Sequence, residues 1–292
     1  MSDKKNPNQT PDTGHEWDGI RELKNDPPRW WMIGFYVTPF FMIGYFLLYP
    51  SIPLFSDYTR GILGWTQVQE FTAGVEEIRA VRAPYEEKVA AMSAAAMLGD
   101  PEMNRYAGIA ARVPFGDNCA PCHGAGGQGR PDYPVLADDD WLHGGTVDAI
   151  VATITDGREG SMPAYGDLLS PEEIDALVTF VSALSRGEEY APGRAVFMGE
   201  TEGGADCAAC HGDDARGMIE IGSANLTDAI WRFDGAAEGI RRTIVHGVNQ
   251  DGALTRKAVM PAFGGKLSED EIKKLAVKVW SLGGGVTEEN EG

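Results

Sequence analysis

The chain has fewer basic than acidic residues, and it lacks a recognisable arrangement of residues that would make or break bonds. Its 25 Lys and Arg are outnumbered by 44 Asp and Glu, which gives a net charge of −19. Binding of nucleic acid requires a basic surface, so we expect no nucleic-acid partner. The 292 residues also contain no nucleophile–base constellation, no nucleotide-binding loop and no open metal site. We therefore expect no enzyme activity in the isolated chain.

Long hydrophobic runs are also scarce, since only residues 30–49 form one. These twenty uncharged residues would cross a hydrocarbon core of about 30 Å as a helix. Trp and Tyr lie near both ends, as is usual at membrane interfaces, and Pro39 is expected to kink the helix. A cleaved signal peptide is the alternative, but the leader has mixed charge and no small-residue cleavage site follows. We predict a transmembrane helix at 30–50.

The distribution of Lys and Arg predicts the orientation of this helix. Residues 1–29 contain five of them, whereas residues 51–80 contain only Arg60 and Arg79. The positive-inside rule then leaves the N-terminus in the cytoplasm and the rest of the chain in a bacterial periplasm. The leader is polar and is expected to be mostly disordered, apart from a short interfacial turn near 16–23 that could dock on a partner.

All four cysteines belong to two Cys-x-x-Cys-His motifs. The first motif is Cys119, Cys122 and His123, and the second is Cys207, Cys210 and His211. Two thiols at this spacing can add to the vinyl groups of one haem while the histidine coordinates its iron. Zinc sites, redox dithiols and disulfides are weaker interpretations, because 84 residues separate the pairs and each pair is followed by histidine. The motifs predict two covalently bound haem c groups.

The region after the membrane helix contains an internal repeat. Residues 141–157 match residues 231–247, and each is followed by a Met-Pro-Ala-aromatic-Gly loop and an acid-rich helix. Ser170 and Ser268 begin these helices, and each has a Glu three residues later, which is the capping-box pattern. Apolar residues then recur at helical spacing. We expect each helix to close one copy of a duplicated domain.

Only Met162 and Met260, of ten methionines, occupy the same place in both copies. They are therefore the candidate sixth ligands of the two irons, and two ordinary core methionines are the alternative. His143 and His246 have no histidine counterpart in the other copy, and His15 lies in the leader. Ligation by two histidines is accordingly the weaker interpretation.

Helix, Cys-x-x-Cys-His, loop, Met-Pro loop and terminal helix together resemble class I cytochrome c domains. The resemblance implies a methionine sulfur opposite each histidine, which raises the reduction potential relative to two histidines. It also implies that the axial histidine donates to a backbone carbonyl in a Pro-x-Leu stretch. Pro134-Val-Leu136 fits that stretch, whereas the second copy has Ala224-Asn-Leu226 and is expected to be looser.

An N-terminal membrane anchor followed by two such domains resembles subunit III of cbb3-type cytochrome c oxidases. The specific features are Trp17-Asp-Gly-Ile-Arg-Glu, Pro28-Arg-Trp-Trp31, Gly64-Trp65 and residues 137–142. The expected fold is mainly α: one N-terminal transmembrane helix followed by two tandem class I cytochrome c domains. The expected division is leader 1–29, transmembrane helix 30–50, periplasmic helical linker 51–103, cytochrome c domains 104–188 and 189–286, and tail 287–292.

The resemblance implies electron relay from a donor cytochrome c towards a haem–copper catalytic subunit, which a mono-haem cytochrome subunit assists. The 20 Lys and Arg and 38 Asp and Glu beyond the membrane give −18, a field that would steer a basic donor or simply keep the protein soluble. The alternatives are a free-standing membrane-anchored shuttle, a cytochrome subunit of a periplasmic dehydrogenase, a di-haem peroxidase and a haem-based gas sensor.

The sequence leaves open which methionine serves which iron. Local pairing, Met162 with His123 and Met260 with His211, is favoured for economy of folding. The exchanged pairing is also open, because a doubled loop length adds only about 0.6 kcal/mol to the closure cost.

Overall fold

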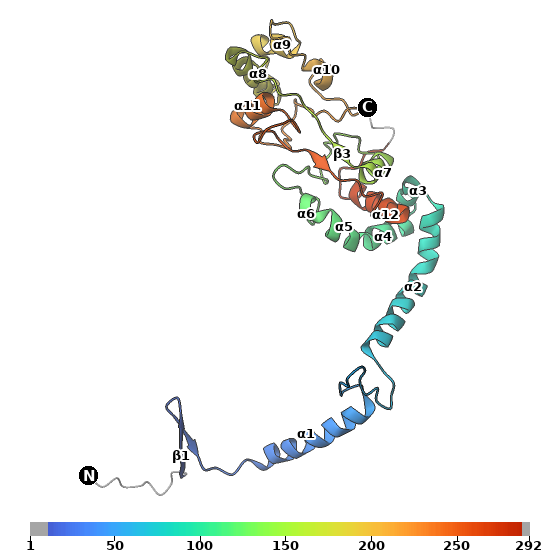
Figure 1. Cartoon of the computed structure of the whole chain (residues 1–292). Helices are drawn as coiled ribbons and strands as arrows, with labels where there is room; N and C mark the ends of the chain where they lie inside the picture. The colour runs from blue at the N-terminus through green and yellow to red at the C-terminus, as the bar shows by residue number, and fades with distance from the viewer. Residues whose placement is uncertain (1–10, 288–292) are drawn as a thin grey trace, which may run out of the picture. The chain divides into compact units, whose positions relative to one another are not determined.

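A computed structural model describes residues 11–287, and these are mainly helical. The chain divides into two compact units, at residues 1–81 and 82–292, which are described here in turn (Figure 1). The expectations for the first ten residues of the leader and for all but the first residue of the tail lie outside the described residues.

The leader forms a hairpin whose turn lies within residues 16–23, where a short turn was expected, although the leader as a whole was expected to be mostly disordered. Strand β1 (Asp12–Trp17) pairs with β2 (Ile20–Leu23) in antiparallel register. Asp18 and Gly19 connect them with φ of 48° and 86°, the left-handed conformation that two-residue hairpin turns require. The Asp-Gly pair was the sequence signal for this hairpin. Both strands are fully exposed to solvent.

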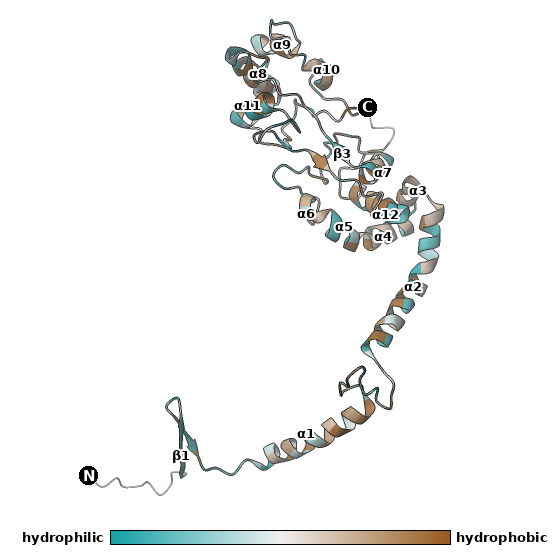
Figure 2. Ribbon diagram, viewed as in Figure 1, coloured by the Kyte–Doolittle hydropathy of each residue, from teal (hydrophilic) through white to brown (hydrophobic). Residues whose placement is uncertain are grey.

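Helix α1 (Arg29–Leu48) coincides with the predicted transmembrane span. It is long and apolar enough to cross a membrane, with a mean hydropathy of 1.6, and no other helix among residues 11–287 is. None of its side chains is buried within the chain, and its surface is largely hydrophobic (Figure 2). The loop that follows folds back on its end, where the Ile62 N–H donates to the Leu47 carbonyl (2.9 Å).

The expected linker contributes to the core of the second unit. Helix α2 (Gln67–Ala91) leads into α3 (Ala94–Gly99) and α4 (Pro101–Ala110). Met97 and Met103 are completely buried within the second unit, although the linker was expected to run to residue 103. The last turns of α2 are also held there, because Glu86 accepts hydrogen bonds from Lys274 (2.7 and 2.9 Å) and Tyr106 (2.5 Å).

The second unit contains two separate hydrophobic cores. The first core is built from helices on both sides of the first cysteine motif and from the last helix of the chain: α3, α4, α5 (Arg112–Asn118), α7 (Val147–Asp156) and α12 (Glu269–Trp280). The second core is built around the second cysteine motif: α8 (Pro171–Leu184), α9 (Ala191–Phe197), α10 (Ala208–His211) and α11 (Ala237–His246). Figure 1 shows these two groups of helices apart from each other.

The two repeats exchange their terminal helices. Helix α8 follows the first repeat in sequence but packs on α9 and α11, whereas α12 ends the second repeat and packs on α4 and α7. Strand β3 (Arg158–Glu159) pairs with β4 (Val259–Met260) where the chain segments cross. The boundaries expected at 104, 188 and 286 remain a prediction, but both cores draw residues from each of the two ranges.

The predicted starts of the terminal helices are confirmed. Ser170 caps α8 and Ser268 caps α12, and each forms a complete capping box with the Glu three residues later. Two backbone donors at each helix start are thereby satisfied. The helical periodicity is confirmed as well, since Ile174 and Leu177 face the second core and Ile272 and Leu275 face the first.

Candidate functional site

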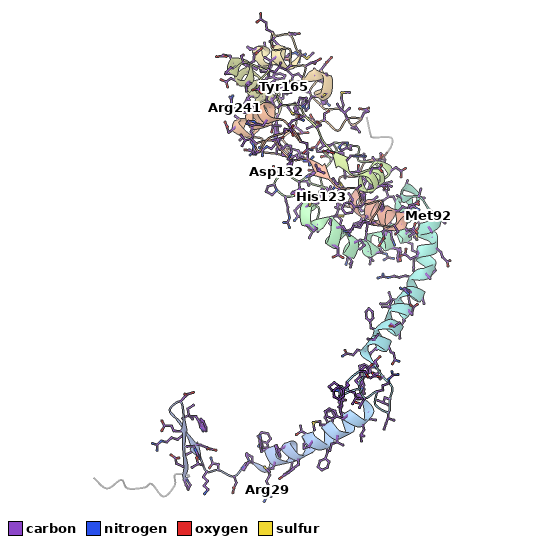
Figure 3. The ribbon with its side chains drawn as sticks, viewed as in Figure 1. Arg29, Met92, His123, Asp132, Tyr165 and Arg241 are labelled. Atoms are coloured by element: carbon purple, nitrogen blue, oxygen red, sulfur yellow. The ribbon has the colours of Figure 1, made fainter. Side chains whose placement is uncertain are left out.

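The first cysteine motif lies at the junction of two short helices. Cys119 ends α5, and α6 (Ala120–His123) carries the rest of the motif. His123 is only 9% exposed, and its Nδ1 lies 3.0 Å from the Pro134 carbonyl oxygen (Figure 3). A carbonyl only accepts, so Nδ1 carries the proton and Nε2 is left with a free lone pair. The predicted role of Pro134 as hydrogen-bond partner is confirmed.

The second motif repeats this geometry without the proline. His211 ends α10, and its Nδ1 lies 3.0 Å from the Ala224 carbonyl oxygen. Burial lowers the pKa of both His123 and His211, against the opposing effect of these carbonyls. Both imidazoles are therefore neutral at pH 7, as a metal-ligating nitrogen must be.

The cysteine side chains also fit a neutral, apolar setting. Burial raises the pKa of the Cys119 and Cys207 thiols to about 11, so that neither is a thiolate at pH 7. A thioether to a haem carries no charge and therefore suits such a buried position. Two sulfurs on one turn, next to a histidine with a free Nε2, fit covalent haem c at both motifs.

The second Met-Pro loop lies against the first core. The Phe263 N–H donates to the Ile154 carbonyl (3.0 Å) and the Gly264 N–H to the Thr155 carbonyl (3.0 Å), both at the end of α7. Met260 packs against the same core as Cys119, the first cysteine of the first motif.

The first Met-Pro loop makes the equivalent contacts with the second core. The Tyr165 and Gly166 N–H groups donate to the carbonyls of Ile244 (3.0 Å) and Val245 (3.2 Å) in α11. Met162 packs against this core, which also holds Tyr165 beside α8 and α11 (Figure 3). This packing fits the exchanged pairing, which the sequence left open, rather than the favoured local pairing.

Two glycines allow the chain segments to cross this closely. Gly157 and Gly247 end α7 and α11 with φ of 71° and 66°. A Cβ on Gly157 would collide with the Met260 carbonyl, and one on Gly247 with the Met162 carbonyl. Glycine is thus required at each position for two reasons: its positive φ, and the close approach of the carbonyl of the other copy's methionine.

The repeat also contains a pair of arginines that sequence reasoning overlooked. Arg158 and Arg256 each lie four residues before the methionine of their own copy. The two arginines align when the Met-Pro loops of the two copies are set in register, which requires an offset of 98 residues. They do not align at the offset of 90 residues that superposes Trp141 on Trp231.

Carboxylates gather at another contact between the repeats. Asp138 and Asp228 occupy equivalent positions, and Asp140 lies close to both. Burial, together with these negative neighbours, raises the pKa of Asp140 to about 6. The loops from the two copies that carry these residues therefore approach each other closely.

Two family models match the chain. One describes the N-terminal domain of cytochrome oxidase-cbb3, FixP, and matches residues 9–56. The other describes cytochrome c oxidase, cbb3-type, subunit III, and matches residues 110–181 and 191–277. The two segments of this second match each contain one cysteine motif.

Similar proteins match over nearly the whole chain. The cbb3-type cytochrome c oxidase subunit FixP of Azorhizobium caulinodans is 42% identical over 94% of this chain and 93% of its own length. FixP of Bradyrhizobium diazoefficiens is 40% identical over 94% of both chains. Subunit CcoP of Cereibacter sphaeroides is 36% identical over 97% of this chain and 98% of its own. With a hairpin, a membrane-length helix and two cysteine motifs in matching order, the chain belongs to the family of subunit III of cbb3-type cytochrome c oxidases.

Proposed function

We propose that this chain holds two covalent haem c groups and relays electrons to the catalytic subunit of a cbb3-type oxidase. The observation that carries the proposal is the exchanged packing, in which Cys119 shares a core with Met260 and Cys207 shares a core with Met162. Haem c supplies an iron that alternates between the ferric and ferrous states.

The proposed ligands cross between the repeats. Cys119 and Cys122 tether the first haem, with His123 and Met260 as axial ligands. Cys207 and Cys210 tether the second haem, with His211 and Met162 as axial ligands. A thioether opposite an imidazole favours ferrous iron and raises the reduction potential.

His123, Met260, His211 and Met162 would hold the two irons, and the surrounding side chains would shield them from water. Pro134 and Ala224 fix the proton on Nδ1 of the axial histidines, and the apolar cores exclude water from the ligand sphere. Filled axial positions suit outer-sphere electron transfer rather than oxygen binding.

The membrane arrangement follows from the charge bias and from α1. We propose that the chain is anchored once in the bacterial inner membrane, with the leader in the cytoplasm and both haem domains in the periplasm. Its proposed partners are the haem–copper catalytic subunit, the mono-haem cytochrome subunit and a donor cytochrome c. The charge of −18 beyond the membrane would steer a basic donor.

The exchanged ligation is tested in single-haem backgrounds. Replacement of Cys207 and Cys210 by Ser leaves only the first motif, and there Met260→His should remove the near-infrared sulfur–iron band and lower the potential. Met162→His should leave that band unchanged in the same background. Met218→Leu, at a 37% exposed methionine outside both Met-Pro loops, is the control. The opposite result, with the band lost in Met162→His, would establish local pairing.

The assignment to an oxidase is tested by purification from native membranes with haem staining. Copurification with a haem–copper subunit is the expected result. A haem-stained chain that purifies alone under mild detergent would instead favour a free-standing shuttle.

A further inference from the structure

Arg158 and Arg256 are half-buried cations at equivalent places in the two repeats. Each lies four residues before its methionine, and the side chain of Arg256 is only 11% exposed. The Nε atom of each guanidinium is buried and has no hydrogen-bond partner among the described residues. A buried charged donor without a partner is costly, so the same shortage at both positions indicates a ligand that supplies acceptors.

The side chain of Arg256 lies next to the loop that orients His123. Its Nη1 lies 3.6 Å from Asp132 Oδ1, and its guanidinium lies 5.3 Å from the centre of the Phe233 ring. Asp132 is two residues before Pro134, whose carbonyl accepts from His123. Arg256 therefore borders the first haem site, to which Met260 of the same segment also belongs.

Arg158 occupies the corresponding place beside the second haem site. Its Nη1 donates to the Gly157 carbonyl (3.3 Å), and its charge, after burial, contributes to the lowered pKa of His143. His143 is the repeat equivalent of Phe233, and its ring lies directly against Gly222. Gly222 in turn is two residues before Ala224, whose carbonyl accepts from His211.

The positive charges of Arg158 and Arg256 are only partly balanced by carboxylates. A third arginine, Arg232, has its pKa lowered by burial and hydrogen-bonds through Nε to the Asp132 backbone carbonyl (3.4 Å). Asp132 is the one carboxylate that forms an ion pair with any of these arginines among the described residues, and its side chain is 54% exposed. The missing partner is therefore anionic, planar and able to accept two parallel hydrogen bonds, which describes a carboxylate.

We propose that Arg256 binds a propionate of the haem tethered at Cys119 and Cys122, and that Arg158 binds a propionate of the haem tethered at Cys207 and Cys210. This inference rests on the proposed function, because it requires a haem at each motif. The propionates supply carboxylates at the edge of the macrocycle, where each arginine borders its own axial-histidine loop.

Each arginine would then tune one reduction potential. A guanidinium that neutralises a propionate removes negative charge near the iron and so favours the ferrous state. Loss of the guanidinium leaves that negative charge in place, which stabilises ferric iron and lowers the midpoint potential of that haem.

The test is redox titration of the full chain in the purified complex, with Arg256→Gln and Arg158→Gln. Arg256→Gln should lower the potential of the first haem alone, and Arg158→Gln that of the second haem alone. The propionate bending band in resonance Raman spectra should shift in the same haem. Arg→Lys at either position retains the charge and should restore most of the potential. Arg130→Gln and Arg216→Gln, at exposed arginines on the two haem loops, are the matched controls.

Unchanged potentials and Raman bands in both Gln variants would overturn the proposal, as would equal effects of Gln and Lys, which would indicate packing alone. The covalent haem count and the near-infrared band are recorded in every variant. If these are absent in the parent protein, the proposed function fails, whereas their presence with unchanged potentials refutes only the propionate sites.

Discussion

The two cores of the second unit reach the same arrangement of histidine, carbonyl and methionine with unequal support. The first core has three helices, α3, α4 and α5, before its cysteine motif, whereas the second has two, α8 and the seven-residue α9. Thr146 caps α7 through its side chain, but Ala236, at the start of α11, has no side-chain cap. The methionines of both cores come from the crossing loops, whereas the outer elements differ between the cores, so we expect these outer elements to make the stabilities unequal. We expect the second core to open first.

The largest expected effect comes from separating the two cores. A fragment of residues 82–188 keeps the first motif but lacks α12, which packs on α4 and α7, and lacks Met260. We expect covalent haem without a low-spin His/Met spectrum and with ready binding of carbon monoxide. The full chain, expressed with the same signal peptide, is the control. A low-spin fragment with a high potential would show that the first repeat is complete by itself.

A smaller effect is expected from the ion pair that ties α12 to α2. Lys274 is 8% exposed, and its Nζ lies 2.7 and 2.9 Å from the two carboxylate oxygens of Glu86. Lys274→Met should lower the free energy of unfolding of the first core by about 1–3 kcal/mol. This is less than the loss expected for a fully buried ion pair, because Glu86 is partly exposed. Urea unfolding monitored by the first haem measures this. Arg241→Met breaks the exposed contact with Asp175 in the second core and should cost about 0–1 kcal/mol.

The same pair gives the first core a pH dependence. Burial by itself would raise the pKa of Glu86, but hydrogen bonds from Lys274 and Tyr106 leave it below its ordinary value of 4.5. The carboxylate therefore contributes stability above the unfolded pKa, and this stability is lost as the pH falls through the folded pKa. Glu86→Gln should flatten the acid limb of the urea midpoint of the first core. An unchanged acid limb would show that the pair does not stabilise α12.

The N-terminal caps of α7 and α11 differ and can be tested by reciprocal substitutions. The Ala149 N–H donates to the Thr146 hydroxyl (3.3 Å), and Ala236 offers no such acceptor. Thr146→Ala should destabilise the first core by about 1 kcal/mol, and Ala236→Thr should stabilise the second by up to that amount. Thermal unfolding followed at each haem would show whether the two midpoints approach each other. Midpoints that stay apart by the parent difference would argue against caps as the cause.

The smallest expected effect concerns the axial-histidine loops. Pro134→Ala gives the first loop the residue that the second has at Ala224, and the carbonyl acceptor is retained at both. Alanine gives the unfolded chain more conformational freedom than proline does, so the free energy of unfolding of the first core should fall by about 0.4–1 kcal/mol. The reduction potential of the first haem should change little. A large fall in the first potential would instead show that the proline ring itself holds the imidazole.

Local patterns sufficed for much of this protein. The twenty apolar residues of α1, the capping boxes at Ser170 and Ser268, and the carbonyl partner of His123 all depend on residues close in sequence. Such features are determined by hydrogen-bond geometry and periodicity, which the order of residues encodes directly. The hairpin turn at Asp18 and Gly19, within the expected turn near residues 16–23, belongs to this class too.

Only the tertiary structure decided which methionine belongs to which core. Met162 and Met260 lie in nearly identical loops, so local and exchanged pairings bury similar surfaces and close loops of similar entropic cost. The choice is made by contacts between segments about a hundred residues apart: α8 on α9 and α11, α12 on α4 and α7, and β3 with β4. The environment of Arg158 and Arg256 is decided in the same way, because their Nε atoms are buried without an acceptor only after the repeats have crossed.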